Sequence, residues 1–274
     1  MTTEQARVTN RLARRQPLTL EGNREAKRLF RAAIDEDSDF MLAYAEQAYA
    51  LLRDCENDWD RYSDSLEEAA RLADKAVELS KDANKSWFND FRALWYRAMV
   101  TWHQNDFPKA FQEYEAARAL ISNPEFLDKN TAELDADMAE ALIYYGDPKR
   151  AIQLVLDAKK RFPGHAWWFH WILARAYYQA ARYQEAIDEI EQIASEKKPN
   201  DVRLILAASK AQLATLDDAN PDTALLDEAK TIMKDFSAIE PEWTLAKSAA
   251  YPYGSASERY HWIDGLRKAG LRPN

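Results

Sequence analysis

A repeated spacing of apolar residues is the feature of this sequence that most restricts its fold. A small residue is followed four positions later by a second apolar residue, and three positions after that by a third. Positions i, i+4 and i+7 share one face of an α-helix, and a small leading residue lets a neighbouring helix approach closely. We call these positions the seam. They are Ala26, Phe30 and Ala33; Ala69, Ala73 and Ala76; Ala110, Tyr114 and Ala117; Ala151, Val155 and Ala158; Ala186, Ile190 and Ile193; and Ala229, Met233 and Phe236.

The seam recurs with a loose period, and another amphipathic run precedes each copy. Successive leading alanines lie about 40 residues apart, and polar insertions at 54–65 and 217–223 account for part of the variation. The preceding runs include 91–104, 132–145, 166–180 and 202–216. Turn residues at 146–148, 163–164, 199–200 and 241 separate or follow these runs. The pattern therefore predicts repeated pairs of helices joined by turns.

Composition supports an ordered, helical chain. Hydrophobic residues make up 47% of the 274 residues, which is enough apolar surface to exclude global disorder. Only six glycines occur, and Ala, Glu, Leu, Lys and Arg dominate the long segments. This composition favours helix over an all-β architecture with many tight turns. We therefore predict an all-α fold.

Charge and hydropathy narrow the possible partners. The net charge of −9 and the absence of a sustained basic stripe argue against nucleic acid as a partner. No run approaches the roughly 20 apolar residues that span a bilayer, and the amino terminus lacks an apolar signal core. Cys55 stands alone and is expected to be an inert, partly buried thiol. We expect a protein of the cytoplasm that is not inserted in a membrane.

The residues at these spacings resemble tetratricopeptide (TPR) repeats, which combine large, small and aromatic positions in a helical hairpin of about 34 residues. The clearest copy contains Leu173, Ala174, Tyr177, Tyr183, Ala186 and Ile190. The preceding copy contains Ala139, Leu142, Gly146, Ala151, Val155, Ala158 and Pro163. The resemblance implies an α-solenoid of about six TPR-like hairpins, with repeats at about 20–245 and a C-terminal cap at about 246–274. It implies one superhelical domain over 1–274.

The C-terminal sequence carries a narrower likeness. Residues 258–274, together with the aromatic stretch that begins at Ala166, are similar to TPR modules found C-terminal to bacterial class III adenylate cyclase or winged-helix domains. Nothing in the chain resembles the cyclase catalytic domain. The likeness therefore implies a signalling scaffold and no nucleotide chemistry.

The stretch His165 to Trp171 packs three tryptophans, a phenylalanine and two histidines into seven residues. Packing between helices explains most of these aromatics, and Trp168 and Trp171 can also form a groove surface. His165 and His170 are five residues apart, which separates them by about 140° on a single helix and argues against a shared metal ion. We expect no metal and no cofactor at this stretch.

The TPR frame assigns a set of side chains to a concave groove formed by the first helix of each hairpin. In the N-terminal half these predicted groove residues are Tyr49, Arg53, Arg92, Trp95, Tyr96, Met99 and Trp102. In the C-terminal half they are Glu133, Asp137, Glu140, Tyr144, Trp168, Trp171, Arg175 and Tyr178. Tyr49 and Met99 stand at positions where chaperone-binding TPR modules use asparagine, which disfavours capture of a chaperone tail.

Signatures of catalysis and metal binding are missing from the sequence. It has no H-E-x-x-H, C-x-x-C, G-x-G-x-x-G, Walker A or G-x-S-x-G motif. The acidic run Asp54, Glu56, Asp58 and Asp60 lacks the glycine and terminal glutamate of an EF-hand, so a solvated insertion is expected. The sequence favours a protein that is not an enzyme.

The predicted function is that of a scaffold or adaptor that binds a peptide or helix of another protein in its groove. Tryptophan, tyrosine and arginine are enriched among the residues that carry interface energy, which favours this interpretation. The alternative is a small-molecule-sensing module with an aromatic pocket near Trp168 and Trp171. Self-association through repeat edges is a further possibility.

Overall fold

Helices joined by turns account for the chain, as the seam predicts. The computed structural model describes residues 4–57, 59, 62–85, 90–122, 127–194, 200–217 and 219–274, and within these ranges it contains α-helices and no strand. The chain forms two compact units, Met1–Leu127 and Asp128–Asn274. The all-α prediction is confirmed, and a single superhelical domain over 1–274 stays a prediction.

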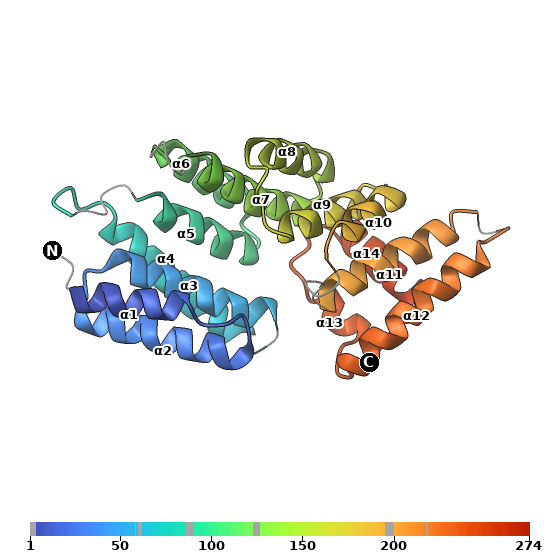
Figure 1. Cartoon of the computed structure of the whole chain (residues 1–274), viewed down its shortest axis with the longest axis horizontal. Helices are drawn as coiled ribbons and strands as arrows, with labels where there is room; N and C mark the ends of the chain where they lie inside the picture. Colours follow the sequence, from blue (N-terminus) through green and yellow to red (C-terminus); the bar gives the residue numbers. More distant parts are fainter. Residues whose placement is uncertain are drawn as a thin grey trace. The chain divides into compact units, whose positions relative to one another are not determined.

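The N-terminal unit contains three helical hairpins (Figure 1). Its helices are α1 (Glu4–Arg14), α2 (Leu20–Glu36), α3 (Met41–Glu56), α4 (Tyr62–Leu79), α5 (Phe91–His103) and α6 (Phe107–Leu120). Each helix packs against the next along the chain from α1 to α6, and α3 also packs against α5. The first hairpin, formed by α1 and α2, begins before residue 20. The repeat bounds of about 20–245 stay a prediction.

The C-terminal unit contains three further hairpins and two additional helices (Figure 1). Its helices are α7 (Leu127–Tyr145), α8 (Pro148–Arg161), α9 (Trp168–Gln179), α10 (Tyr183–Glu191), α11 (Asn200–Ala214), α12 (Thr223–Ile239), α13 (Leu245–Ala249) and α14 (Ala256–Lys268). The six hairpins of the two units match the predicted number. The first helices of the hairpins are α1, α3, α5, α7, α9 and α11.

The seam residues are buried in every hairpin. The most exposed of them, Ala26, shows 5% of its surface to solvent. The seam lies on α2, α4, α6, α8, α10 and α12, the second helices of the hairpins, with Ile193 just beyond the end of α10. Alanine and other apolar groups at these spacings remove one helical face from water, and this burial stabilises the stacked hairpins.

Three turns inside hairpins each contain a residue with a positive φ angle. Asn105, Gly146 and Ala181 have positive φ angles of 66°, 100° and 56°, and each stands five residues before the leading alanine of its seam. A left-handed residue at this place ends the first helix and reverses the chain. Asp106 and Asp147 then cap the following helices by accepting hydrogen bonds from the backbone N–H groups three residues on. The turns are therefore short and have a defined geometry.

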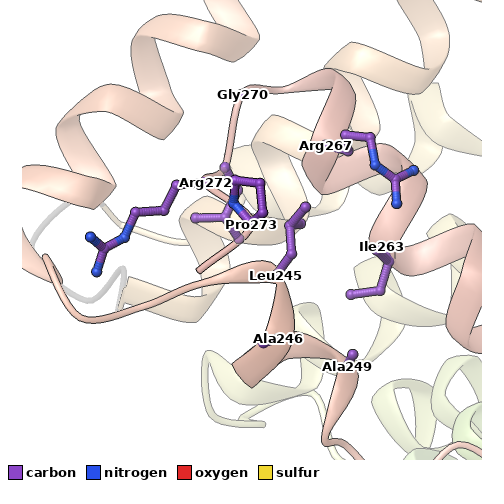
Figure 2. A pocket seen from close by; sticks show the side chains of 9 residues that line it. Leu245, Ala246, Ala249, Ile263, Arg267, Gly270, Arg272 and Pro273 are labelled. Atoms are coloured by element: carbon purple, nitrogen blue, oxygen red, sulfur yellow. The ribbon is translucent and has the colours of Figure 1, made fainter.

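The chain after Thr244, residues 245–274, is called the C-terminal segment below. Its last residues return to α13, where the backbone N–H of Leu245 donates to the carbonyl of Arg272 at 2.9 Å. Figure 2 shows Pro273 and Arg272 beside Leu245, with Ile263 on the neighbouring helix. The predicted C-terminal cap is thus present as two helices and a folded-back tail.

Helix α14 packs along the first helices α9 and α11. Gly265 makes this approach possible, because a Cβ at this position would overlap the Tyr178 hydroxyl and lie 3.2 Å from the Cβ of Ala208. Trp262 and Leu266 on the same helix are buried. None of the helices in the described part of the chain combines the length and hydropathy needed to cross a bilayer.

Candidate partner-binding surface

Three predicted groove residues of the N-terminal unit form one stacked group, called the Arg53 group. The rings of Tyr49 on α3 and Tyr96 on α5 are stacked, with centroids 5.3 Å apart and planes 9° apart. The guanidinium of Arg53, one turn after Tyr49, lies 4.4 Å from the centroid of the Tyr49 ring. All three side chains are half-buried, so an edge of the group reaches solvent. It presents a cation and two aromatic rings.

Arg92 lies at the start of α5, where Asp90 fixes it. The Arg92 Nε donates to the Asp90 carboxylate at 2.9 Å, and the same carboxylate caps the helix through the Arg92 backbone N–H. Arg92 is half-buried. Its charge is therefore held by a partner of its own chain, unlike a freely mobile surface arginine.

Trp95, Met99 and Trp102 belong to the interior of the N-terminal unit. Each is buried, and the Trp102 ring centroid lies 3.8 Å from that of His103. The TPR frame places these residues on the correct helix, but neighbouring side chains cover them. They stabilise the unit and are not accessible to a partner in this structure.

Glu46 is a buried acid that the sequence pattern did not single out. It precedes Tyr49 by one turn on α3, and only 4% of its surface is exposed. Asn10 on α1 donates to its carboxylate at 3.4 Å, and the Arg14 Nε lies 3.3 Å away. Burial raises the pKa of Glu46 to about 7. The sequence signal that could have identified Glu46 is an acidic residue among the alanines of α3.

Arg175 on α9 lies inside an aromatic cage. Its guanidinium lies 4.9 Å from the ring centroid of Tyr144, 5.3 Å from Tyr251, 5.0 Å from Trp262 and 6.0 Å from Trp171. It also donates a hydrogen bond to the Tyr253 hydroxyl at 3.3 Å, and only 4% of the residue is exposed. No acidic side chain of the described residues forms an ion pair with it. The aromatic faces take the place of a carboxylate in stabilising the charge.

The C-terminal segment covers this part of the predicted groove. The backbone N–H of Gly254 donates to the carbonyl of Tyr144 at 2.8 Å, and the Tyr251 ring stacks on the Tyr144 ring with centroids 6.0 Å apart. The Tyr178 hydroxyl donates to the carbonyl of His261 at 2.8 Å. Tyr144, Arg175 and Tyr178 are therefore buried under the chain's own residues, which the TPR frame could not anticipate.

The other predicted groove residues of the C-terminal unit remain half-buried. They are Glu133, Asp137 and Glu140 on α7 and Trp168 and Trp171 on α9. Burial raises the pKa of Glu133, although Lys129 opposes the shift. Acidic and aromatic groups thus share the uncovered part of these two helices. Their assignment to a partner surface stays a prediction.

The histidines of the aromatic stretch meet, contrary to the expectation from a single helix. Helix α9 begins at Trp168, so His165 lies in the preceding turn, and the Nε2 atoms of His165 and His170 are 3.3 Å apart. The His170 Nδ1 lies 2.7 Å from the Glu189 carboxylate, which also accepts from Lys159 at 2.9 Å. The argument from a 140° rotation was wrong because it assumed an earlier helix start. No group of three or more potential metal ligands occurs among the described residues.

Two open pockets lie along the C-terminal segment. One, of about 600 Å³, is lined by Leu245, Ala246, Ala249, Ile263, Arg267, Gly270, Leu271, Arg272 and Pro273 (Figure 2). The other, of about 640 Å³, lies where the turns before α8 and α10 meet the start of α14. Neither is lined by Trp168 or Trp171, the residues proposed for a small-molecule pocket. Asp58 and Asp60 of the acidic run lie outside the described residues.

Residues 136–202 match the family model of the tetratricopeptide repeat. This part of the chain carries tetratricopeptide-repeat sequence. This match spans the hairpin α7/α8, the hairpin α9/α10 and the start of α11. The sequences of curated proteins contain no match to the chain. The likeness to modules that accompany cyclase or winged-helix domains stays a prediction.

Solved structures show the same fold. Cut9 of the APC/C hetero-tetramer Cut9–Hcn1 aligns with a TM-score of 0.60 and 14% identity, over 98% of this chain and 46% of that one. The pilF protein of Pseudomonas aeruginosa aligns at 0.53 and 14%, over 88% and 94% of the two chains. A signal transduction ATPase with a TPR sensor, from Pyrococcus horikoshii, aligns at 0.52 and 17%, over 96% and 42%. At these identities the likeness concerns the fold alone.

Proposed function

We propose that the protein is a non-catalytic scaffold that binds a peptide or helix of a partner protein through the first helices of its hairpins. The observation that carries the proposal is the Arg53 group, in which Tyr49, Arg53 and Tyr96 are stacked and half-buried. Aromatic and arginine side chains bury large areas on binding at modest entropic cost. Their packing against one another pre-organises them for a partner.

The half-buried part of α7 and α9 supplies a second surface under the same proposal. Trp168 and Trp171 offer apolar area, and Glu133, Asp137 and Glu140 offer negative charge. The repeat fold supports this function, because stacked hairpins bury their seams and leave the faces of their first helices for other contacts. The fold neighbour Cut9 assembles with Hcn1 in a hetero-tetramer. Cys55 is buried and forms no disulfide, and we propose the cytoplasm as the compartment.

Partner capture tests the proposal. The tagged protein and the variant Tyr49→Ala/Arg53→Ala are used to capture proteins from a lysate of the source cells. Proteins bound by the wild type should be lost from the variant, because the substitution removes one ring and the cation of the Arg53 group. Circular dichroism and the thermal midpoint report whether the variant keeps its fold.

A matched control comes from the C-terminal unit. Arg182 is exposed and lies 4.6 Å from the ring centroid of Tyr177, so Arg182→Ala removes a similar cation and ring contact elsewhere. This variant should capture the same proteins as the wild type. The same set of proteins on all three baits would contradict the proposal. Alanine at Trp95 or Arg175 is unsuitable, because both residues are buried and their loss would disturb the fold.

A further inference from the structure

The aromatic cage of the C-terminal unit contains a short turn of the chain itself, in which the Tyr253 backbone N–H donates to the Tyr251 carbonyl at 2.8 Å. Tyr251, Pro252 and Tyr253 follow α13 without helical structure, and Pro252 and Tyr253 are buried. The two tyrosines lie around the Arg175 guanidinium and the Tyr144 ring. The backbone of Gly254 adds a hydrogen bond to the Tyr144 carbonyl. The fold thus displays one ligand that first-helix residues of this protein accept, a short Tyr-Pro-Tyr segment.

The receptor side of this contact has two parts. The first is an aromatic residue followed four positions later by arginine on one first helix, where the Arg175 guanidinium lies 6.0 Å from the Trp171 ring centroid. The second is a tyrosine from the adjacent first helix, Tyr144 on α7. The arginine lies near both rings, and its guanidinium also lies 5.3 Å from the Tyr251 ring centroid and donates to the Tyr253 hydroxyl.

The Arg53 group contains the same kinds of side chain in the N-terminal unit, although its second ring contacts the first ring and not the arginine. Tyr49 and Arg53 are four positions apart on α3, with the guanidinium 4.4 Å from the Tyr49 ring centroid. Tyr96 comes from the adjacent first helix α5 and stacks on Tyr49. The neighbouring helix follows in the chain here, whereas α7 precedes α9 in the C-terminal unit. The chemical set of one arginine and two aromatic rings is the same.

The two groups differ in their accessibility. Arg175 and Tyr144 are buried under the C-terminal segment, whereas Arg53, Tyr49 and Tyr96 are half-buried and keep solvent-accessible surface. The Tyr251–Gly254 stretch of the same chain is already engaged at Arg175, with Tyr253 buried. The Tyr251–Gly254 stretch is therefore not available to the Arg53 group, which can instead receive a similar segment of another molecule.

We propose that the Arg53 group binds a tyrosine- and proline-containing turn of a partner protein. This inference rests on the proposed function and names the chemistry of the partner. A tyrosine of the segment stacks on the Arg53 guanidinium, and proline restricts the backbone of the segment, which lowers the entropy lost on binding. Such a segment is neutral, so binding depends little on salt.

A labelled peptide tests the inference directly. The probe is fluorescein-labelled Ser-Ala-Ala-Tyr-Pro-Tyr-Gly-Ser-Ala, the sequence of residues 248–256 of this chain. Fluorescence anisotropy should show saturable binding to the full-length protein. Arg53→Ala should weaken the affinity about tenfold, the scale of a partly desolvated cation–π contact. Arg182→Ala should leave it unchanged, and a probe with both tyrosines replaced by alanine should not bind.

Two results of the titration would overturn the inference. Equal affinity for the wild type and Arg53→Ala would place the probe elsewhere, including at Arg175 by exchange with the C-terminal segment. Equal affinity for the tyrosine-free probe would remove the aromatic requirement. An unchanged circular dichroism spectrum and unfolding midpoint of Arg53→Ala would show that the loss of binding comes from the missing side chain and not from a loss of the fold.

Selection from a displayed library of random nine-residue peptides separates this inference from the proposed function. Enrichment of tyrosine- and proline-containing peptides that is lost on Arg53→Ala supports both. Selected peptides that need Arg53 but lack aromatic residues overturn the inference and leave the scaffold function standing. No selection of any peptide contradicts both.

Discussion

The guanidinium of Arg175 lies 4.9 Å from the ring centroid of Tyr144, and both side chains are buried beneath residues that follow more than 70 positions later. This contact joins two neighbouring first helices and receives the C-terminal segment through Tyr251 and Tyr253. A buried cation without a carboxylate partner is stable here because aromatic faces and a phenol surround it. Burial also raises the pKa of Tyr144 well above its ordinary value, so its hydroxyl keeps its proton.

Removing the Arg175 side chain should destabilise the C-terminal unit. Arg175→Ala leaves a cavity between four rings and should lower the free energy of unfolding by about 3 kcal/mol. Arg175→Met keeps most of the side-chain volume and removes the buried charge, so it should lower the free energy of unfolding by less, about 1 kcal/mol. Urea unfolding measures both values, and hydrogen exchange shows in which unit protection is lost. A more stable Arg175→Ala would mean that the cage does not favour the cation.

The close approach of α14 to α9 predicts a strong dependence on Gly265. Gly265→Ala should lower stability by about 2 kcal/mol, because the new methyl group overlaps the Tyr178 hydroxyl. In a Tyr178→Phe background the same substitution should be less harmful by about 1 kcal/mol, since the overlapping oxygen is gone. A double-mutant cycle measured by urea unfolding yields this coupling. Additive effects would show that α14 does not depend on this contact.

The left-handed turn residues predict a stabilising substitution. Ala181 adopts a φ of 56° at the place where Gly146 stands in the preceding hairpin. A side chain at positive φ is strained, so Ala181→Gly should raise stability by about 0.5–1 kcal/mol. Gly146→Ala should lower stability by a similar amount. Thermal unfolding measures the change in stability of both variants. Changes of the same sign would show that the positive φ angle does not explain them.

Glu46 predicts a pH-dependent stability in the N-terminal unit. Burial raises its pKa from 4.5 to about 7, so the folded state binds more protons than the unfolded state between these values. The contribution of Glu46 to the free energy of unfolding is therefore fully present below pH 4.5 and is lost as the pH rises through about 7. Glu46→Gln stays neutral, and should be more stable than the wild type at pH 8 by up to about 3 kcal/mol.

The comparison of Glu46→Gln with the wild type at pH 5 and pH 8 checks this assignment. The two proteins should differ little at pH 5, where Glu46 is mostly protonated in the folded state. Glu25→Gln, at an exposed position of α2, is the control and should keep the pH dependence of the wild type. A Glu46→Gln variant that loses stability at pH 8 would show that the ion pair with Arg14 outweighs the burial of the charge.

The buried face of each second helix could be predicted from the sequence. This prediction succeeded because it depends only on residue spacing within one helix. A helix carries Ala151, Val155 and Ala158 on one face whatever surrounds it, so the seam identifies the buried face and the paired helices. The same frame correctly located Tyr49, Arg53 and Tyr96 on first helices. The expectation that His165 and His170 lie apart on a single helix was wrong, because α9 begins only at Trp168 and His165 precedes it, which lets the two rings approach each other.

The sequence by itself determined the helical hairpins, their number and their packing face, since these depend on residue spacings within one turn or two of helix. Only the tertiary structure decided which predicted groove residues are accessible. Tyr144, Arg175 and Tyr178 are buried because Tyr251, Tyr253 and α14 return to them from far along the chain. Such coverage depends on contacts between distant residues, and a periodic pattern assigns a side chain to a helical face without showing what packs on that face.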